Sequence, residues 1–157
     1  MSNDPAGYEL PLLLLLGFRT IIEDLHGELA RRGHPDARPL HGFVCQALGR
    51  DGATAAELGR RLGVSKQAAG KTIDALERLG YADRAKDPHD ARRKIVMLTP
   101  HGEDMLRKSV PIFDALRADW ERALGPMRLR ALEADLRTVT SGRAMRLDIP
   151  GWFGNAA

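Results

Sequence analysis

The sequence contains a single cysteine, Cys45, among 157 residues, and only eight aromatic residues of the Phe, Trp and Tyr types. One cysteine cannot form a disulfide within the chain or a cysteine-based zinc site, and it suits a reducing cytoplasm. Because aromatic residues are few, we expect a core of Leu, Ile, Val, Met and Ala, as in a helical bundle. The length predicts one compact domain over residues 1–157.

Long apolar runs are also absent. The five leucines at 12–16 are far fewer than the roughly 20 apolar residues that span a bilayer. Acidic Asp4 and Glu9 precede them, where a signal peptide would carry basic residues. We therefore expect neither a membrane partner nor a signal peptide.

Patterns of enzymes and metal sites are missing as well. The five histidines lack the HExxH spacing, and no glycine-rich phosphate loop ends in Lys-Ser or Lys-Thr. His41 and Cys45, spaced i, i+4, could in principle bind a metal or sense oxidants, but further ligands are lacking and a place at the core is favoured. We expect no enzymatic activity, no metal and no cofactor.

The segment from 54 to 80 has the pattern of a helix-turn-helix. Thr54 and Glu57 form a capping box, so a first helix begins near Ala55. It ends at Gly63, and Ser65 is a good N-cap for a second helix that runs from Lys66 to about Leu79. That helix has a buried stripe and closes at Gly80; the stripe consists of Ala69, Ile73, Leu76 and Leu79.

The opposite face of the second helix is left for a partner. Its residues offer cations for phosphate or guanine, an amide suited to adenine and a gap for close backbone approach: Lys66, Gln67, Gly70 and Lys71. Any solvated helix can carry Lys and Gln. The tight turn before the helix and the segment after it favour DNA binding over that simpler interpretation.

The segment after Gly80 is typical of a wing. Residues 81–85 and 94–98 are predicted strands, and the polar stretch 86–93 between them is a predicted hairpin loop. Residues 60–94 contain ten Lys and Arg against five Asp and Glu, whereas the whole chain carries a net charge of only +3. The positive charge is therefore concentrated on the predicted DNA-binding surface.

With these motifs, the chain resembles the MarR family of bacterial transcriptional regulators. The resemblance rests on Thr54-Ala55-Ala56-Glu57-Leu58, Leu62-Gly63-Val64-Ser65, Leu76-Glu77-Arg78-Leu79-Gly80-Tyr81, Asp87-Pro88-His89-Asp90-Ala91-Arg92-Arg93-Lys94 and Val96-Met97-Leu98-Thr99-Pro100-His101-Gly102. By this resemblance, Arg92 matches the wing arginine that enters the minor groove, and Asp87 the acid that braces the wing. Ala91 and Gly70 depart from the pattern, since many relatives have Arg and Ser there.

The predicted DNA-contacting residues form one set on the second helix and the wing. They are Ser65, Lys66, Gln67, Gly70, Lys71, Arg84, Arg92 and Arg93.

Further helices are predicted at 11–32, 39–49, 100–124 with a kink at Pro111, and about 126–139. The fold class is thus mainly α with a small β-hairpin wing: a winged helix-turn-helix lobe at about 36–99 and dimerisation helices at about 8–33 and 100–145. The terminal helices have more apolar surface than a small lobe can cover, which favours a two-fold homodimer. Closure of these stripes within one chain is the alternative.

The sequence thus predicts a DNA-binding regulator, most often a repressor, that binds a pseudo-palindromic operator of double-stranded DNA. The resemblance implies a bacterial, cytoplasmic, nucleoid-associated protein with a small aromatic or lipophilic effector. Chain position suggests that Phe18, His41, Cys45 and Trp120 line the effector cleft. The alternative function is that of a winged-helix adaptor that binds another protein without reading DNA sequence.

Overall fold

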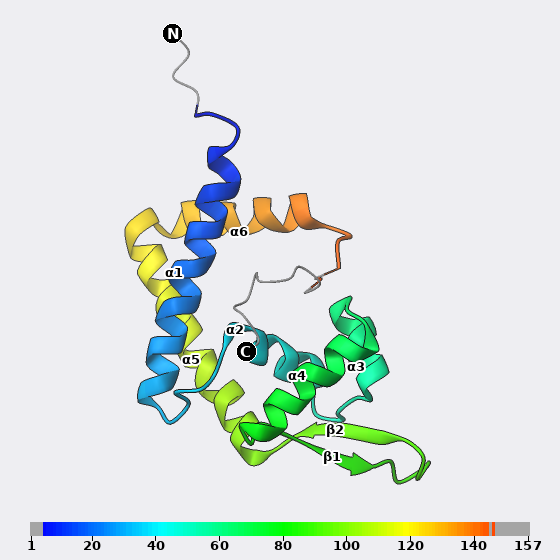
Figure 1. Ribbon diagram of the computed structural model, residues 1–157. Helices are drawn as coiled ribbons and strands as arrows, with labels where there is room; N and C mark the ends of the chain where they lie inside the picture. Colours follow the sequence, from blue (N-terminus) through cyan, green and yellow to red (C-terminus); the bar gives the residue numbers. More distant parts are fainter. Residues whose placement is uncertain (1–4, 145, 147–157) are drawn as a thin grey trace.

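The computed structural model describes residues 5–144 and 146. In chain order the described elements are α1 (Glu9–Arg31), α2 (Pro39–Leu48), α3 (Ala55–Leu62), α4 (Lys66–Arg78), β1 (Ala82–Lys86), β2 (Lys94–Leu98), α5 (Pro100–Leu124) and α6 (Pro126–Thr140). Figure 1 shows α2, α3, α4 and the hairpin gathered in one lobe, while α1 and α5 extend away from it and α6 follows the far end of α5. The predicted helical fold with a hairpin wing is confirmed.

The helix-turn-helix has the caps that the sequence predicts. Thr54 Oγ1 accepts a hydrogen bond from Glu57 N at 3.2 Å, and the Glu57 carboxylate accepts one from Thr54 N at 2.8 Å. Gly63 adopts the left-handed conformation with φ of 66°, which favours glycine. Ser65 Oγ accepts from Ala68 N at 3.1 Å. These local bonds fix the angle at which α4 leaves α3.

The apolar stripes of the lobe meet in one core. Leu58 of α3, together with Ile73 and Leu76 of α4, is completely buried. Further buried side chains come from the second half of α1, from α2 and from α5, and include Ile22, Leu25, Leu29, Val44, Leu48 and Met105. Leu79 is only half-buried, because it lies at the C-cap of α4 instead of inside the helix. The lobe is therefore packed against the adjoining parts of α1 and α5.

The wing is an antiparallel hairpin whose register runs from Ala82 opposite Leu98 to Lys86 opposite Lys94. A third segment, which the sequence analysis did not predict, pairs with it: Ala53 and Val96 exchange two backbone hydrogen bonds of 3.0 and 2.8 Å. Gly52 permits this approach, since a Cβ there would lie 2.3 Å from Val96 O and its φ is 69°. The start of α3 is thus tied directly to the wing.

The terminal helices are packed very differently along their length. All five leucines at 12–16 are exposed, whereas Ile22, Leu25 and Leu29 of the same helix are buried.

α5 continues through Pro111 without interruption. Among the described residues, none of the helices combines the length and the apolar character required to cross a membrane.

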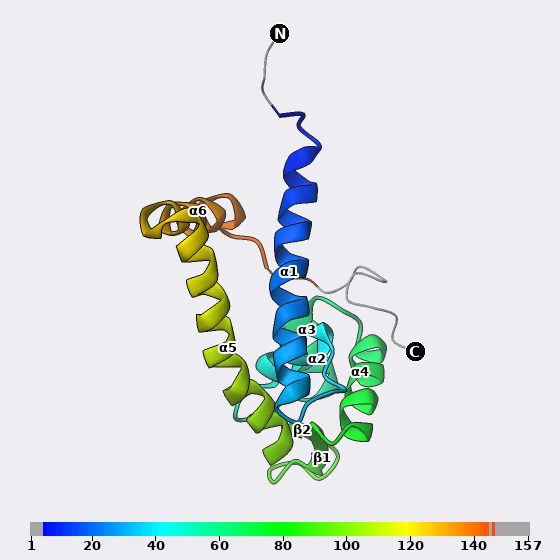
Figure 2. The same cartoon turned by 90° about the vertical axis from the view of Figure 1, so that its left-hand side faces the viewer.

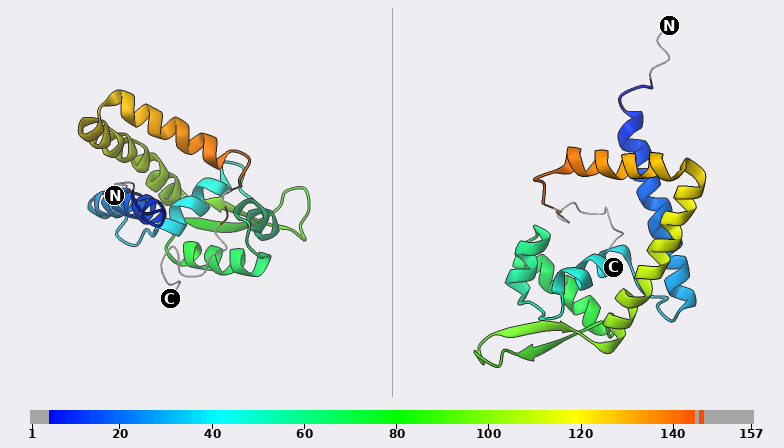
Figure 3. Two further views of the ribbon diagram at one scale, coloured as in Figure 1. Left: turned by 90° about the horizontal axis from the view of Figure 1, so that it is seen from above. Right: turned by 180° about the vertical axis from the view of Figure 1, so that it is seen from behind.

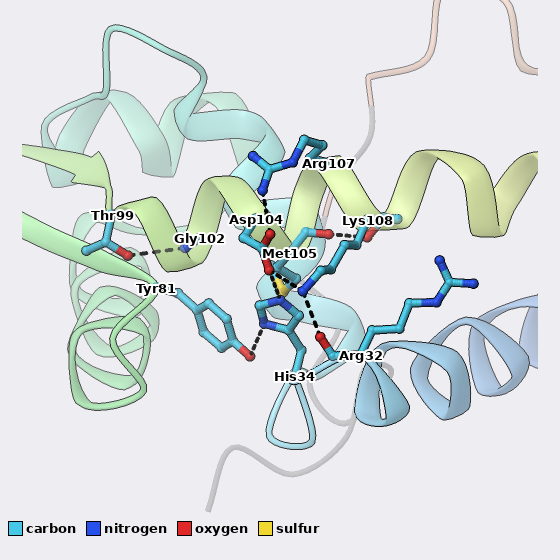
Figure 4. Close-up of polar contacts among 10 residues, drawn as sticks. Arg32, His34, Tyr81, Thr99, Gly102, Asp104, Met105, Arg107 and Lys108 are labelled. Carbon is cyan, nitrogen blue, oxygen red and sulfur yellow. Dashed lines mark hydrogen bonds and ion pairs between the residues drawn. The ribbon is translucent and has the colours of Figure 1, made fainter.

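A buried histidine joins the lobe to α5 (Figure 4). His34, in the loop after α1, is 1% exposed; its Nε2 donates to Asp104 Oδ2 at 2.8 Å, and its Nδ1 lies 3.3 Å from the Tyr81 hydroxyl. The His101 ring lies 4.5 Å from His34 and stacks on Tyr81 at 4.7 Å between centroids. Lys108 Nζ lies 2.6 Å from Asp104 Oδ2. The cluster fixes where the recognition lobe sits on α5.

Candidate nucleic-acid interface

The outer face of α4 is open to a partner. Lys66, Gln67 and Lys71 are exposed, and a Cβ added to Gly70 would meet nothing within 4 Å. Packing within the chain therefore does not require glycine at position 70. Ser65 is also exposed, but its hydroxyl is occupied by the cap of α4. The face has the size, exposure and polar groups that a helix needs to enter the major groove.

The tip of the wing is held by short-range hydrogen bonds. Asp87 N donates to Arg93 O at 2.9 Å, and Asp87 Oδ1 accepts from His89 N at 2.8 Å. Asp90 Oδ1 accepts from Arg92 N at 3.0 Å. The second carboxylate oxygen of Asp87 lies 3.9 Å from Arg93 Nε. Asp87 thus contacts both ends of the loop, a position suited to bracing it.

Two of the predicted DNA-contacting arginines are engaged by acids of the chain itself. Arg84 Nη1 lies 2.8 Å from Asp74 Oδ1 and also contacts Glu77, so this side chain is held against the second half of α4. Arg93 Nη2 lies 3.0 Å from Glu57 Oε1. Such pairs lower the charge available to a phosphate, because a carboxylate already occupies the guanidinium.

The remaining predicted cations have no such partner in the described part of the chain. Lys66, Lys71 and Arg92 are exposed and form no ion pair with a described acidic residue. They are therefore the cations best placed to contact phosphate groups.

A groove of about 460 Å³ with several basic residues in its lining lies between α3, the start of α4 and the wing. Residues 54–56 at the start of α3 form one side, and its basic residues are Lys66, Arg84, Arg92, Arg93 and Lys94. A phosphate group suits such a groove, because cations and the N-termini of two helices surround it. Four of the eight predicted residues meet here. Lys94 also lines the groove but is not among the predicted DNA-contacting residues, although it follows Arg92 and Arg93 directly.

A separate, mostly apolar pocket of about 300 Å³ lies between α1, α2 and α5. Apolar side chains such as Ile22, Leu25, Phe43 and Phe113 line it, with His26 and Arg38 as basic groups. None of the four residues suggested for an effector cleft is part of this lining. Position along the chain does not show which faces of α1, α2 and α5 turn toward this pocket.

The four suggested residues have other surroundings. Phe18 stacks on Phe43 at 6.4 Å and so lies next to the pocket. Trp120 packs against α1, where a Cβ on Gly17 would come within 3.0 Å of its ring.

The other two are buried in α2. His41 Nδ1 accepts a hydrogen bond from Arg38 N, and burial lowers the pKa of His41. Cys45 is completely buried, and burial raises the pKa of its thiol to about 12.

Comparison with known proteins agrees with this architecture. Residues 46–93 match the sequence model of the MarR family. A stretch of 44 residues is 43% identical to an uncharacterized HTH-type transcriptional regulator, YcgE, of Bacillus subtilis. That alignment spans 28% of this chain and 29% of the relative.

Solved structures share the fold over most of the chain. A mutant of S. aureus MepR has a TM-score of 0.69 at 19% identity, and covers 88% of this chain and 98% of its own. Wild-type MarR from E. coli without ligand has a TM-score of 0.63 at 21% identity, with the same coverage. Another MepR mutant, solved with a bound oligodeoxyribonucleotide, has a TM-score of 0.61 at 20% identity. The region of the helix-turn-helix thus matches the MarR family model, and most of the chain shares the fold of MepR and MarR.

Proposed function

We propose that this protein is a transcriptional regulator that binds double-stranded DNA through α4 and the wing. The observation that carries the proposal is the exposed face of α4, where Lys66, Gln67 and Lys71 surround a glycine with open space above it. Arg92 at the wing supplies a further cation beside the same groove. The oligodeoxyribonucleotide bound to a MepR mutant of the same fold supports this assignment.

The proposed assembly is a two-fold homodimer on a pseudo-palindromic operator. Exposed apolar side chains support it, because most of them gather on the terminal helices, whereas Met97 is the exposed one on the hairpin among the described residues. Those on the terminal helices include Leu10, Leu12, Leu13, Leu14, Leu15, Leu16, Val110, Met127 and Val139. A two-fold axis through these helices would present two copies of α4 about one turn of DNA, or 34 Å, apart. Figure 2 shows the first half of α1 extending beyond the lobe.

Repression with release by an effector is the proposed mode of action. The pocket between α1, α2 and α5 supports it, because it lies where a lobe helix meets the two long helices. A small aromatic or lipophilic molecule suits its apolar lining, and ligand bound there would change the angle between lobe and dimer.

Gly42 offers a way to test the pocket. It lines the pocket, and a Cβ there would meet nothing within 4 Å. Gly42→Leu should place an apolar side chain in this space and weaken binding of the fluorescent aromatic anion anilinonaphthalene sulfonate. Gly27→Ala on α1, outside the pocket lining, is the control. Equal binding by both variants would contradict an effector site here.

Substitutions on α4 and the wing test DNA binding itself. Gln67→Ala should cost about 1–3 kcal/mol on a duplex selected by the wild-type protein and much less on random duplexes. Lys71→Ala and Arg92→Ala should weaken binding to all duplexes and flatten the salt dependence by about one unit per lost phosphate contact. Arg92 keeps some preference for narrow minor grooves of A-tracts in this scheme.

The adaptor alternative makes the opposite prediction. A protein that uses its basic face for an acidic partner shows no sequence preference among duplexes. If all three variants bind every duplex as the wild type does, the DNA-binding proposal is wrong and the adaptor function is the better one.

A further inference from the structure

One carboxylate connects the start of α3 with the wing. Glu57 Oε2 accepts from Thr54 N at 2.8 Å, while Glu57 Oε1 lies 3.0 Å from Arg93 Nη2. The bond from the Thr54 backbone, the Thr54 side chain and the charge of Arg93 hold the pKa of Glu57 below its usual range. The residue that caps a lobe helix is therefore also an anionic partner of the DNA-binding surface.

Arg93 lies between two carboxylates. Its Nη2 contacts Glu57 on α3, and its Nε lies 3.9 Å from Asp87 in the wing. Phosphate oxygens compete for the same guanidinium hydrogens that a carboxylate uses. Arg92, the preceding residue, lines the same groove but forms no ion pair with an acid in the described residues. Adjacent arginines of the wing thus have different partners.

A backbone bridge near this ion pair also links the start of α3 to the wing. Ala53 is hydrogen-bonded to Val96, and Val96 lies two residues beyond Lys94 at the start of β2. The side-chain pair of Glu57 and Arg93 therefore lies farther toward the tip than the backbone bridge does. The backbone bridge and the ion pair therefore attach the wing to the start of α3 at two points along the hairpin.

We propose that Glu57 positions the wing and determines specificity by holding Arg93 as a strut, which keeps Arg93 away from DNA phosphates. The inference rests on the proposed DNA binding and refines it. Arg93 then supports the wing and does not contact DNA itself. Affinity for DNA of arbitrary sequence grows with the number of phosphates neutralised. A wing arginine that is withheld lowers this background affinity, while the fixed wing keeps Arg92 in register with α4.

The test compares Glu57→Gln, Arg93→Gln and the double variant on a random duplex, over about 50 to 200 mM salt. Glutamine keeps the capping box, so α3 should remain folded. Released Arg93 should add one phosphate contact in Glu57→Gln. The salt slope then steepens by about 0.9, and affinity at 0.1 M salt rises about eightfold. Arg93→Gln should keep the wild-type slope, and the double variant should lose the gain.

A matched control separates this contact from a general change of charge. Asp83→Asn removes an exposed acid of β1 that forms no ion pair with the described residues, so it should leave the slope unchanged. Amide hydrogen exchange provides a second measurement. Glu57→Gln and Arg93→Gln should both accelerate exchange at Asp87 and Arg93, whose amides are bonded within the wing loop.

Each of the following results would overturn the inference. A slope about 0.9 shallower in Arg93→Gln means that Arg93 already contacts phosphate. A gain that persists in the double variant, or that Asp83→Asn reproduces, means that net charge alone is responsible. If Lys71→Ala flattens the salt dependence of binding while Glu57→Gln has the same salt dependence and affinity as the wild type, only this inference fails. A wild-type protein that binds no duplex overturns both this inference and the proposed function.

Discussion

The winged lobe and the first half of α1 are both rich in leucine, but they differ in what covers it. Leu58 of α3 is 0% exposed, whereas Leu13 of α1 is 62% exposed. Both leucines lie in helices of the same chain, so the residue type alone does not explain why one is buried and the other exposed. The difference lies in the available partner, because α3 packs on α4 and α2 while the start of α1 extends beyond the lobe (Figures 2 and 3).

The boundary between these two regions falls inside a single helix. Ile22, Leu25 and Leu29 belong to the core of the chain, and the leucines at 12–16 do not. A deletion of residues 1–32 would therefore remove core residues and the proposed dimer surface together. Point substitutions in the first half of α1 separate the two roles.

The largest expected effect is on assembly. The double variant Leu13→Gln with Leu16→Gln changes four leucines in a two-fold dimer, two in each protomer. At about 1.5 kcal/mol for each buried leucine, the loss of association free energy is about 6 kcal/mol. Sedimentation equilibrium should then show folded monomers, whereas Arg19→Gln on the same helix should remain dimeric. A double variant that still dimerises would show that these leucines are not at the interface.

A smaller effect is expected when the core of the lobe is altered. Ile73 is completely buried, so Ile73→Ala should lower the free energy of unfolding by about 2–5 kcal/mol. Urea unfolding monitored by circular dichroism measures this loss, and Lys71→Ala on the exposed face of α4 serves as the control. A loss no larger than that of the control would mean that the lobe is not packed as described.

The joint between the two regions should respond to acid. Hydrogen bonds from Lys108 and His34 lower the pKa of Asp104 to about 2. Because this folded-state pKa lies below the unfolded one, the stabilisation is present above about pH 4 and is lost as the pH falls toward 2. Asp104→Asn should reduce stability at pH 7 and flatten the decline over that window.

The exposed Asp24 gives the matched control for this joint, because it forms no ion pair with a described residue. Asp24→Asn should keep the wild-type dependence on pH. Urea unfolding at a series of pH values measures both variants. If Asp104→Asn and the wild type decline in parallel, the Asp104 contacts do not stabilise the joint.

The smallest effect is expected at Cys45. Its thiol is buried and its pKa is raised to about 12, so very little reactive thiolate forms at neutral pH. Cys45→Ser should leave any response of DNA binding to peroxide unchanged, as measured by gel shift before and after oxidant. Loss of a strong peroxide response in this variant would show that Cys45 senses oxidants.

Much of the lobe could be predicted because its signals are local. The Thr54 and Glu57 cap, the turn at Gly63 and the Ser65 cap each involve residues a few positions apart, and the structure has all of them. The strands of the wing were predicted at 81–85 and 94–98 and are observed at Ala82–Lys86 and Lys94–Leu98. Hydrophobic period and turn chemistry act over the same short range.

The contacts that define the interface could not be predicted in this way. Glu57 and Arg93 are 36 positions apart, and His34 and Asp104 are 70 apart. Nothing in the sequence marks either pair, because charged residues are common throughout the chain. The pairing of Arg84 with Asp74 and Glu77 likewise depends on how β1 lies against α4.

The sequence by itself determined the order of the helices and strands and most of their limits, because caps, glycine turns and apolar periods are properties of neighbouring residues. The tertiary structure decided which cations remain available, which apolar residues are covered, and where the pocket lies. Burial and ion pairing depend on the rotation and approach of whole elements. Arg92 and Arg93 show the distinction most clearly: they are identical and adjacent in sequence, but among the described residues only Arg93 forms ion pairs, with Glu57 and Asp87.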